Sequence, residues 1–167
     1  PRHLTALQRK LKVRVKAVAI VDGAESFWAS DKGDEVAETA NPESERLFVF
    51  SNKSDFENSL KFLFKHASFY KVFVTTKDIY IPNAEEWNVD SLDSNLATLP
   101  TKEYAIIETS DENNQLIVWY DQDNVRESRS IRLANFSPLK NETFRYKKIL
   151  SDFLLRANRN DGVYQIT

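Results

Sequence analysis

The chain has 167 residues but contains no Cys, no Met, only three Gly and only two His. Without Cys there are no disulfides, thiolate metal sites or cysteine nucleophiles, and this composition fits the reducing interior of a cell, either cytoplasm or nucleus. His3 and His66 are too few for a His-led zinc site, which takes three or four ligands. No apolar run approaches the about 20 residues that a membrane helix needs. We therefore predict an intracellular protein with no membrane segment and no metal site.

The scarcity of glycine also excludes the two common glycine-rich loops that bind nucleotides. Phosphate-binding loops need several glycines close together, so that backbone N–H groups can approach the anion. Gly23, Gly33 and Gly162 lie far apart, and neither GxGxxG nor GxxxxGK[ST] occurs. We expect no cofactor.

The charge, in contrast, is abundant and unevenly distributed. The net charge of -2 conceals three regions: residues 1–16 carry +6, residues 17–125 carry -13, and residues 126–167 carry +5. Two basic ends thus flank an acidic middle. Either the ends meet as one basic surface, or they neutralise the acidic middle within a single fold.

Apolar periodicity predicts one domain spanning 1–167, of the α+β class, since 41% of the residues are apolar and supply a core. Its sheet is expected to be mixed or antiparallel, with helices on one face. Two amphipathic helices are predicted at about 54–67 and 138–157, after a short N-terminal helix or arm at 1–11. Strands are expected within 12–21, 46–50, 70–81, 104–109, 116–120, 130–133 and 163–166. The first of these starts at an exposed edge and ends buried.

The helix at 54–67 has the clearest local signals. Ser54 and Glu57 match a capping box, with Ser54 as the N-cap. One buried stripe is predicted, formed by Phe56, Leu60, Leu63, Phe64 and Ala67. His66 falls in the last turn, where a cation favours the helix dipole, so we assign it a structural role.

Two segments before this helix are less regular. Phe27 and Trp28 are predicted to begin a return strand. The polar residues 31–45, which include Pro42, are predicted to form a long loop or a weak hairpin.

The basic ends carry the candidate nucleic-acid-binding residues. The aromatic residues Phe144 and Tyr146 alternate with basic residues there, as a surface that stacks nucleic-acid bases requires. Tyr146 also fits the buried stripe of the second helix. The candidates are Arg9, Lys10, Lys12, Arg14, Lys16, Arg145, Lys147 and Lys148.

Three acidic residues form an alternative, catalytic candidate. Asp22 ends a buried strand, Glu57 begins a helix and Asp78 ends a second strand. This order is similar to that of ribonuclease-H-like nucleases, and the resemblance implies two divalent metal ions that activate water for phosphodiester cleavage. It covers residues 17–81 only. The chain departs from the family pattern at Lys77, where a member would carry its Asp, and in the hairpin at 104–120.

The sequence therefore favours a non-enzymatic binding or regulatory module that contacts another macromolecule, with a protein partner first. Exposed strands or the acidic stretches 31–45 and 84–93 would meet that partner. Nucleic-acid binding through the basic ends is the second hypothesis, and the metal-dependent nuclease is the third.

Overall fold

The computed structural model describes residues 2–21, 27–80, 103–108, 116–120, 131–133, 147–148 and 150–167. Its helices are α1 (Arg2–Leu11), η1 (Phe27–Ala29), α2 (Asp31–Glu38), α3 (Lys53–Ala67) and η4 (Leu155–Arg159). Its strands are β1 (Arg14–Val21), β2 (Glu45–Phe50), β3 (Lys71–Thr76), β4 (Glu103–Glu108), β5 (Leu116–Tyr120), β6 (Ile131–Leu133) and β7 (Tyr164–Ile166). Residues 77–80, 147–148 and 150–154 are also helical.

The strands form one mixed sheet in the order β6-β5-β4-β1-β2-β3-β7. β1, β2 and β3 are parallel, and α2 and α3 supply the crossovers that parallel neighbours require. The remaining neighbours are antiparallel, including the predicted β4–β5 pair and the C-terminal β7 beside β3. The predicted α+β class with a mixed sheet is confirmed.

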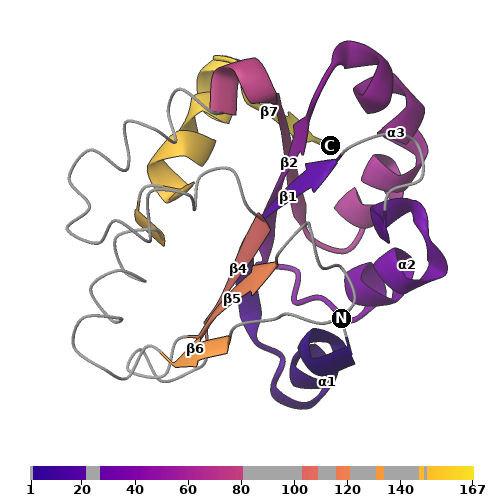
Figure 1. The fold of residues 1–167 in the computed structure, drawn as a ribbon, viewed down its shortest axis with the longest axis vertical. Helices are drawn as coiled ribbons and strands as arrows, with labels where there is room; N and C mark the ends of the chain where they lie inside the picture. The colour runs from indigo at the N-terminus through magenta and orange to yellow at the C-terminus, as the bar shows by residue number, and fades with distance from the viewer. Residues whose placement is uncertain are drawn as a thin grey trace.

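Helices cover both faces of this sheet, so the prediction of helices on one face was wrong. α1, α2 and α3 lie on one side of the sheet in Figure 1, and the helical residues 147–148 and 150–154, in yellow and called the C-terminal helix below, lie on the other. Leu150, Phe153 and Leu154 pack there against Val18 and Leu47. The physical reason is that β2 and β3 are apolar on both faces, so each face needs a cover.

Alternation along β1 decides which side chains meet which helices. Val15, Ala17 and Ala19 are buried on the face of α2 and α3, whereas Arg14 and Lys16 point to the other face. β1 is an internal strand between β4 and β2, not the exposed edge that was predicted. Arg14 is exposed because it stands at the end of the strand.

The segment predicted as a long loop, 31–45, contains α2. Ser30 is its N-cap and accepts a hydrogen bond from the Gly33 backbone N–H at 3.4 Å. Gly33 lets this turn pack on η1, since a Cβ there would lie 2.6 Å from the Trp28 carbonyl oxygen. Phe27 and Trp28 themselves lie in η1, not in the predicted return strand.

The predicted length of α3 was correct, but its predicted N-cap and buried face were wrong. Its N-cap is Asn52, whose side chain accepts from the Asp55 N–H at 2.8 Å, and Ser54 lies inside the helix. The buried face consists of Ser59, Phe62, Leu63 and His66. The stripe is therefore rotated toward α2, and Phe64, predicted to be buried, is 55% exposed.

Helical structure also replaces the end of a predicted strand. β3 stops at Thr76, and residues 77–80 form a helical turn in place of the strand expected to 81. Predictions for residues 81–102 and 134–146, including the first part of the helix at 138–157, lie outside the described residues.

Candidate functional site

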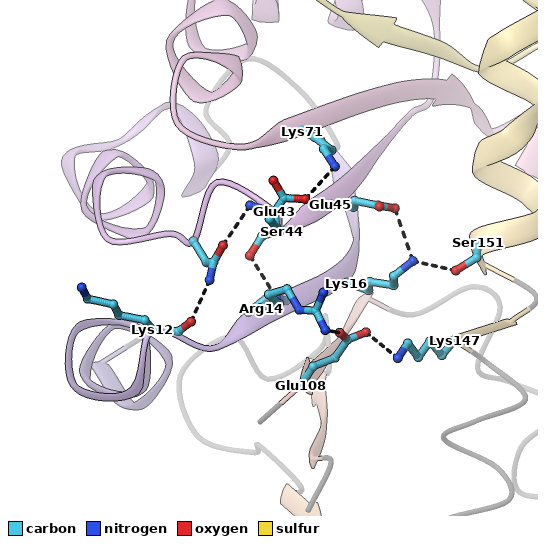
Figure 2. Close-up of polar contacts among 12 residues, drawn as sticks. Lys12, Arg14, Lys16, Glu43, Ser44, Glu45, Lys71, Glu108, Lys147 and Ser151 are labelled. Atoms are coloured by element: carbon cyan, nitrogen blue, oxygen red, sulfur yellow. Dashed lines mark hydrogen bonds and ion pairs between the residues drawn. The ribbon is translucent and has the colours of Figure 1, made fainter. Parts of the chain in front are cut away.

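The predicted basic residues of β1 lie in a row of charged side chains at the end of the sheet where β1 and β2 begin (Figure 2). Arg14 is paired in register with Glu108 of β4, and Lys16 with Glu45 of β2. The row is completed by two residues of the C-terminal helix, Lys147 and Ser151. We call these six residues the charged row.

Glu108 is the centre of the charged row. Its carboxylate lies 3.3 Å from an Arg14 guanidinium nitrogen and 3.0 Å from Lys147 Nζ. The Glu108 side chain is only 6% exposed, so these two cations compensate a largely buried charge. The two basic ends of the chain thus come together, and both pair with the carboxylate of Glu108.

Lys16 forms the second half of the charged row. Its Nζ lies 3.4 Å from a Glu45 carboxylate oxygen and donates a hydrogen bond of 2.6 Å to Ser151 Oγ. Because directly opposite charges stabilise neighbouring strands, the row favours the observed register of β1. Lys16 and Glu108 also link the C-terminal helix to this face, through Ser151 and Lys147.

The other predicted basic residues are dispersed. Arg9 pairs with Glu35 at 2.9 Å, both exposed. Lys10, Lys12 and Lys148 are exposed and form no ion pair with a described residue, while Arg145 lies outside the described residues. α1 and the C-terminal helix lie on opposite sides of the sheet, so Lys10 and Lys148 share no face (Figure 1).

The three predicted catalytic acids do not form a described site. Asp22 lies outside the described residues. Glu57 is exposed on α3 and pairs with Lys53 at 3.6 Å, and Asp78 is exposed on the turn 77–80. Within the described ranges, no group of three or more His or acidic residues could hold a metal ion. The nuclease hypothesis stays a prediction that depends on Asp22.

A buried cation lies on the other face of the sheet, under α2 and α3. Arg46 of β2 is 4% exposed, and its guanidinium carbon lies 4.0 Å from the centre of the Trp28 ring. Its Nη1 atom has no hydrogen-bond partner, and Arg46 forms no ion pair with a described residue. Sequence patterns missed this residue because Arg46 stands at the start of a strand, where exposure is the usual expectation.

His66 lies beside this cation and is fully buried. Its Nδ1 shares a hydrogen bond of 2.6 Å with Tyr70 Oη, and the rings of Trp28, Phe48 and Phe62 pack around it. Burial, and then the Arg46 charge, lower the pKa of His66 from 6.5 to about 4. His66 is therefore neutral at pH 7, and its structural role is packing within this aromatic cluster rather than charge at the helix end.

A third region is the edge of the sheet at β7. Two large exposed apolar side chains lie here on the α3 side: Phe64 is 55% exposed and Tyr164 is 49% exposed. Tyr164 pairs in register with Val74, whose side chain belongs to the core under α3, and Ile166 packs against that same core. On the opposite face, η4 contacts β7 and presents Leu155, which is 59% exposed.

Helix geometry turns Phe64 toward this edge. Lys65 reaches α2 through an ion pair of 2.6 Å with Asp34. Leu60, Phe64 and Ala67 share the flank that is turned away from α2, because residues four and seven apart lie on one side of a helix. We call Phe64, Tyr164, Leu155 and the outer backbone of β7 the β7 edge surface. The available sequence signal was Tyr164 in a short terminal strand, whereas Phe64 was misassigned to the core.

Comparison with known proteins gives no match: no family model, no curated protein and no solved structure resembles the chain significantly. No helix among the described residues is long and apolar enough to cross a membrane.

Proposed function

We propose that this chain is a non-enzymatic module that binds another protein, and that the partner covers the β7 edge surface. The observation that carries the proposal is the gathering of exposed apolar side chains at one sheet edge. Of the four large hydrophobic side chains that are exposed among the described residues, Phe64, Leu155 and Tyr164 lie on β7 or on elements that contact it. Exposed apolar groups gathered in this way are typical of interaction surfaces.

The strand itself supports the same proposal. β7 is the last strand of the sheet and pairs with β3 on one side. Its outer backbone groups have no strand partner among the described residues. Such an edge is a template for a segment of another chain.

Affinity capture from the native host tests the proposal with a matched control. The wild-type chain and a Leu11→Gln variant should recover the same partner, since Leu11 is 61% exposed on α1, outside the β7 edge surface. A Phe64→Gln/Tyr164→Gln variant should lose it. If every captured protein binds all three chains equally, the partner does not use this surface and the proposal fails.

Nucleic-acid binding is the second candidate, and the exposed Lys10 and Lys12, which form no ion pair with a described residue, support it. The binding would rest on Lys10 and Lys12 at the end of α1, because the cations of the charged row already have acidic partners and Lys148 lies on the other side of the sheet. Retention on heparin at low salt that disappears in Lys10→Ala/Lys12→Ala would support this function. No retention of the wild-type chain on heparin or DNA would exclude it.

A further inference from the structure

We infer that two copies of this chain cover each other's β7 edge surface, with their β7 strands paired antiparallel about a two-fold axis. The inference goes beyond the proposed function, because a second copy and the protein partner then compete for one surface. It rests on how the outer backbone, the apolar side chains and the charges are arranged along this edge.

The outer backbone of β7 can pair with itself. β3 occupies the inward groups of Tyr164, Gln165 and Ile166, and alternate residues of a strand direct their groups outward. A two-fold axis at Gln165 sets Tyr164 opposite Ile166 of the second copy and sets Gln165 opposite its own counterpart. Residues that face outward in one copy thus meet outward-facing residues in the other, so the sheet continues from one chain into the next.

Phe64 and Tyr164 stand toward opposite ends of β7. α3 runs antiparallel to β3, as a helix between parallel strands does, and a short connection joins its end to the start of β3. Phe64 lies one turn before the end of α3, close to the level of Val72 and its neighbour Ile166. Tyr164 is opposite Val74, two residues further along β3.

The two-fold axis brings these unlike ends together. Because paired antiparallel strands run in opposite directions, the Ile166 end of one β7 lies beside the Tyr164 end of the other. On the α3 side, Phe64 of each copy then approaches Tyr164 of the second copy, and the contact occurs twice. Phe64 is 55% exposed and Tyr164 is 49% exposed, so both side chains lose contact with water. The β7 edge surface is therefore complementary to itself.

The opposite face of the edge also carries an exposed apolar side chain. Gln165 points to this face, since it is opposite Phe73 of the core under the C-terminal helix, and η4 contacts β7. Leu155 of η4 is 59% exposed. A two-fold axis perpendicular to the sheet keeps equivalent faces on one side, so Leu155 of both copies lies on one face of the joined sheet. A second copy thus brings apolar side chains to both faces.

The exposed charges at this edge have both signs. Arg159 stands at the end of η4, Asp152 on the C-terminal helix and Asp78 on the turn after β3; none of them forms an ion pair with a described residue. An edge of one sign repels its own copy, whereas this edge offers carboxylates and a guanidinium to the second copy. Charge therefore does not oppose the pairing that the apolar side chains favour.

Sedimentation equilibrium of the full chain tests the dimer directly. Each copy contributes a strand of only 3 residues, so we expect a weak dimer that dissociates at about 10–100 µM chain. Phe64→Gln/Tyr164→Gln should weaken association at least about tenfold. Leu11→Gln, which changes an exposed leucine on α1, should leave it unchanged. A wild-type chain that stays monomeric up to about 1 mM would overturn the inference.

The two single variants test which side chains meet. In a two-fold dimer, Phe64→Gln or Tyr164→Gln alone damages both of the contacts between Phe64 and Tyr164. A mixture of the two variants forms a mixed dimer in which one contact is intact, so it should associate several-fold more tightly than either variant alone. Equal association of the mixture and the single variants would show that the two side chains do not meet across the axis.

Because the chain has no Cys, one introduced cysteine reports on the strand pairing. Gln165→Cys places a thiol of each copy directly opposite its counterpart, where the Cβ atoms of facing residues lie about 4.5–5.5 Å apart. Mild oxidation should link this variant into a dimer at least about tenfold faster than Leu11→Cys, which introduces an exposed thiol on α1. Equal rates would contradict the two-fold pairing of β7.

Two outcomes separate this inference from the proposed function. If the chain forms the dimer but affinity capture recovers no partner that needs Phe64 and Tyr164, the inference holds and the proposed function fails. If capture recovers such a partner and the chain is monomeric at every concentration, the proposed function holds and the inference is wrong.

Discussion

The two faces of this sheet hold buried charge in opposite ways. On the face of the C-terminal helix, Glu108 is compensated by Arg14 and Lys147. On the face of α2 and α3, Arg46 lies against Trp28 and beside the neutral His66, with no carboxylate partner among the described residues. One face holds its buried charge in ion pairs, whereas the other holds a buried cation beside a histidine that is neutral at pH 7. The two faces should therefore respond differently to acid and to substitution.

Acid should give the largest effect, on the face of α2 and α3. His66 has a folded-state pKa of about 4, below its ordinary 6.5, so the unfolded chain binds its proton more readily. Its contribution to stability is complete above pH 6.5 and is lost as the pH falls to 4. This loss should reach about 3 kcal/mol.

Urea unfolding at pH 7 and pH 4 measures this loss when wild type is compared with His66→Phe. The carboxylates titrate in both chains, so the difference between them isolates His66. An equal loss of stability in the two chains would contradict the assignment.

Substitution in the charged row should give the next largest effect. Glu108→Gln removes the acid that compensates two cations, and we expect the free energy of unfolding to fall by about 1–2 kcal/mol, since Arg14 is largely exposed. Glu43→Gln is the matched control, because Glu43 pairs with Lys71 at 3.1 Å on the surface and should cost less than about 0.5 kcal/mol. Equal effects in urea unfolding would show that burial of Glu108 contributes nothing.

The cap of α3 tests the stability of the face of α2 and α3 without changing the protonation of His66. Asn52→Ala should destabilise the chain by about 1 kcal/mol, because the Asp55 N–H loses its acceptor. Ser54→Ala should cost less than about 0.5 kcal/mol if Ser54 is not the N-cap. Thermal unfolding of both variants decides between the observed cap and the capping box expected from the sequence.

The smallest expected effect concerns the coupling between Arg46 and His66. Arg46→Met removes a positive charge that lowers the pKa of His66, so this pKa should rise toward its ordinary value. The chain has only two His, so a proton NMR titration gives two imidazole signals, and His3 serves as the internal reference. An unchanged His66 pKa would mean that burial alone lowers it.

Much of the fold could be predicted because it depends on local patterns. The alternation of residue types along the chain predicted β4, β5 and β7, and the helical spacing of apolar residues predicted α3. The exact face of α3 could not be predicted, because Phe62 and Phe64 are equally apolar and only the position of α2 decides which one is buried. α2 was missed because its residues are mostly polar and its start depends on a contact between Gly33 and the backbone of η1.

The candidate site was harder to predict than the fold. The sequence located the basic ends and their excess charge, and two of those residues do meet in space. Nothing in the sequence indicated that they would meet on Glu108, since strand register sets that contact. Arg46 and the β7 edge surface were missed because both depend on which strands become neighbours.

The pairing of β3 with β7 also constrains when the sheet can be completed during synthesis. Val72 pairs with Ile166, so more than ninety further residues must be synthesised after β3 before its neighbour β7 is available. At typical rates of translation, this delay is roughly 5–20 s. Nascent chains halted before Tyr164 should expose the β3 edge and be cleaved by added protease faster than the full chain. The surface that we assign to a partner is therefore the last part of the sheet to leave the ribosome.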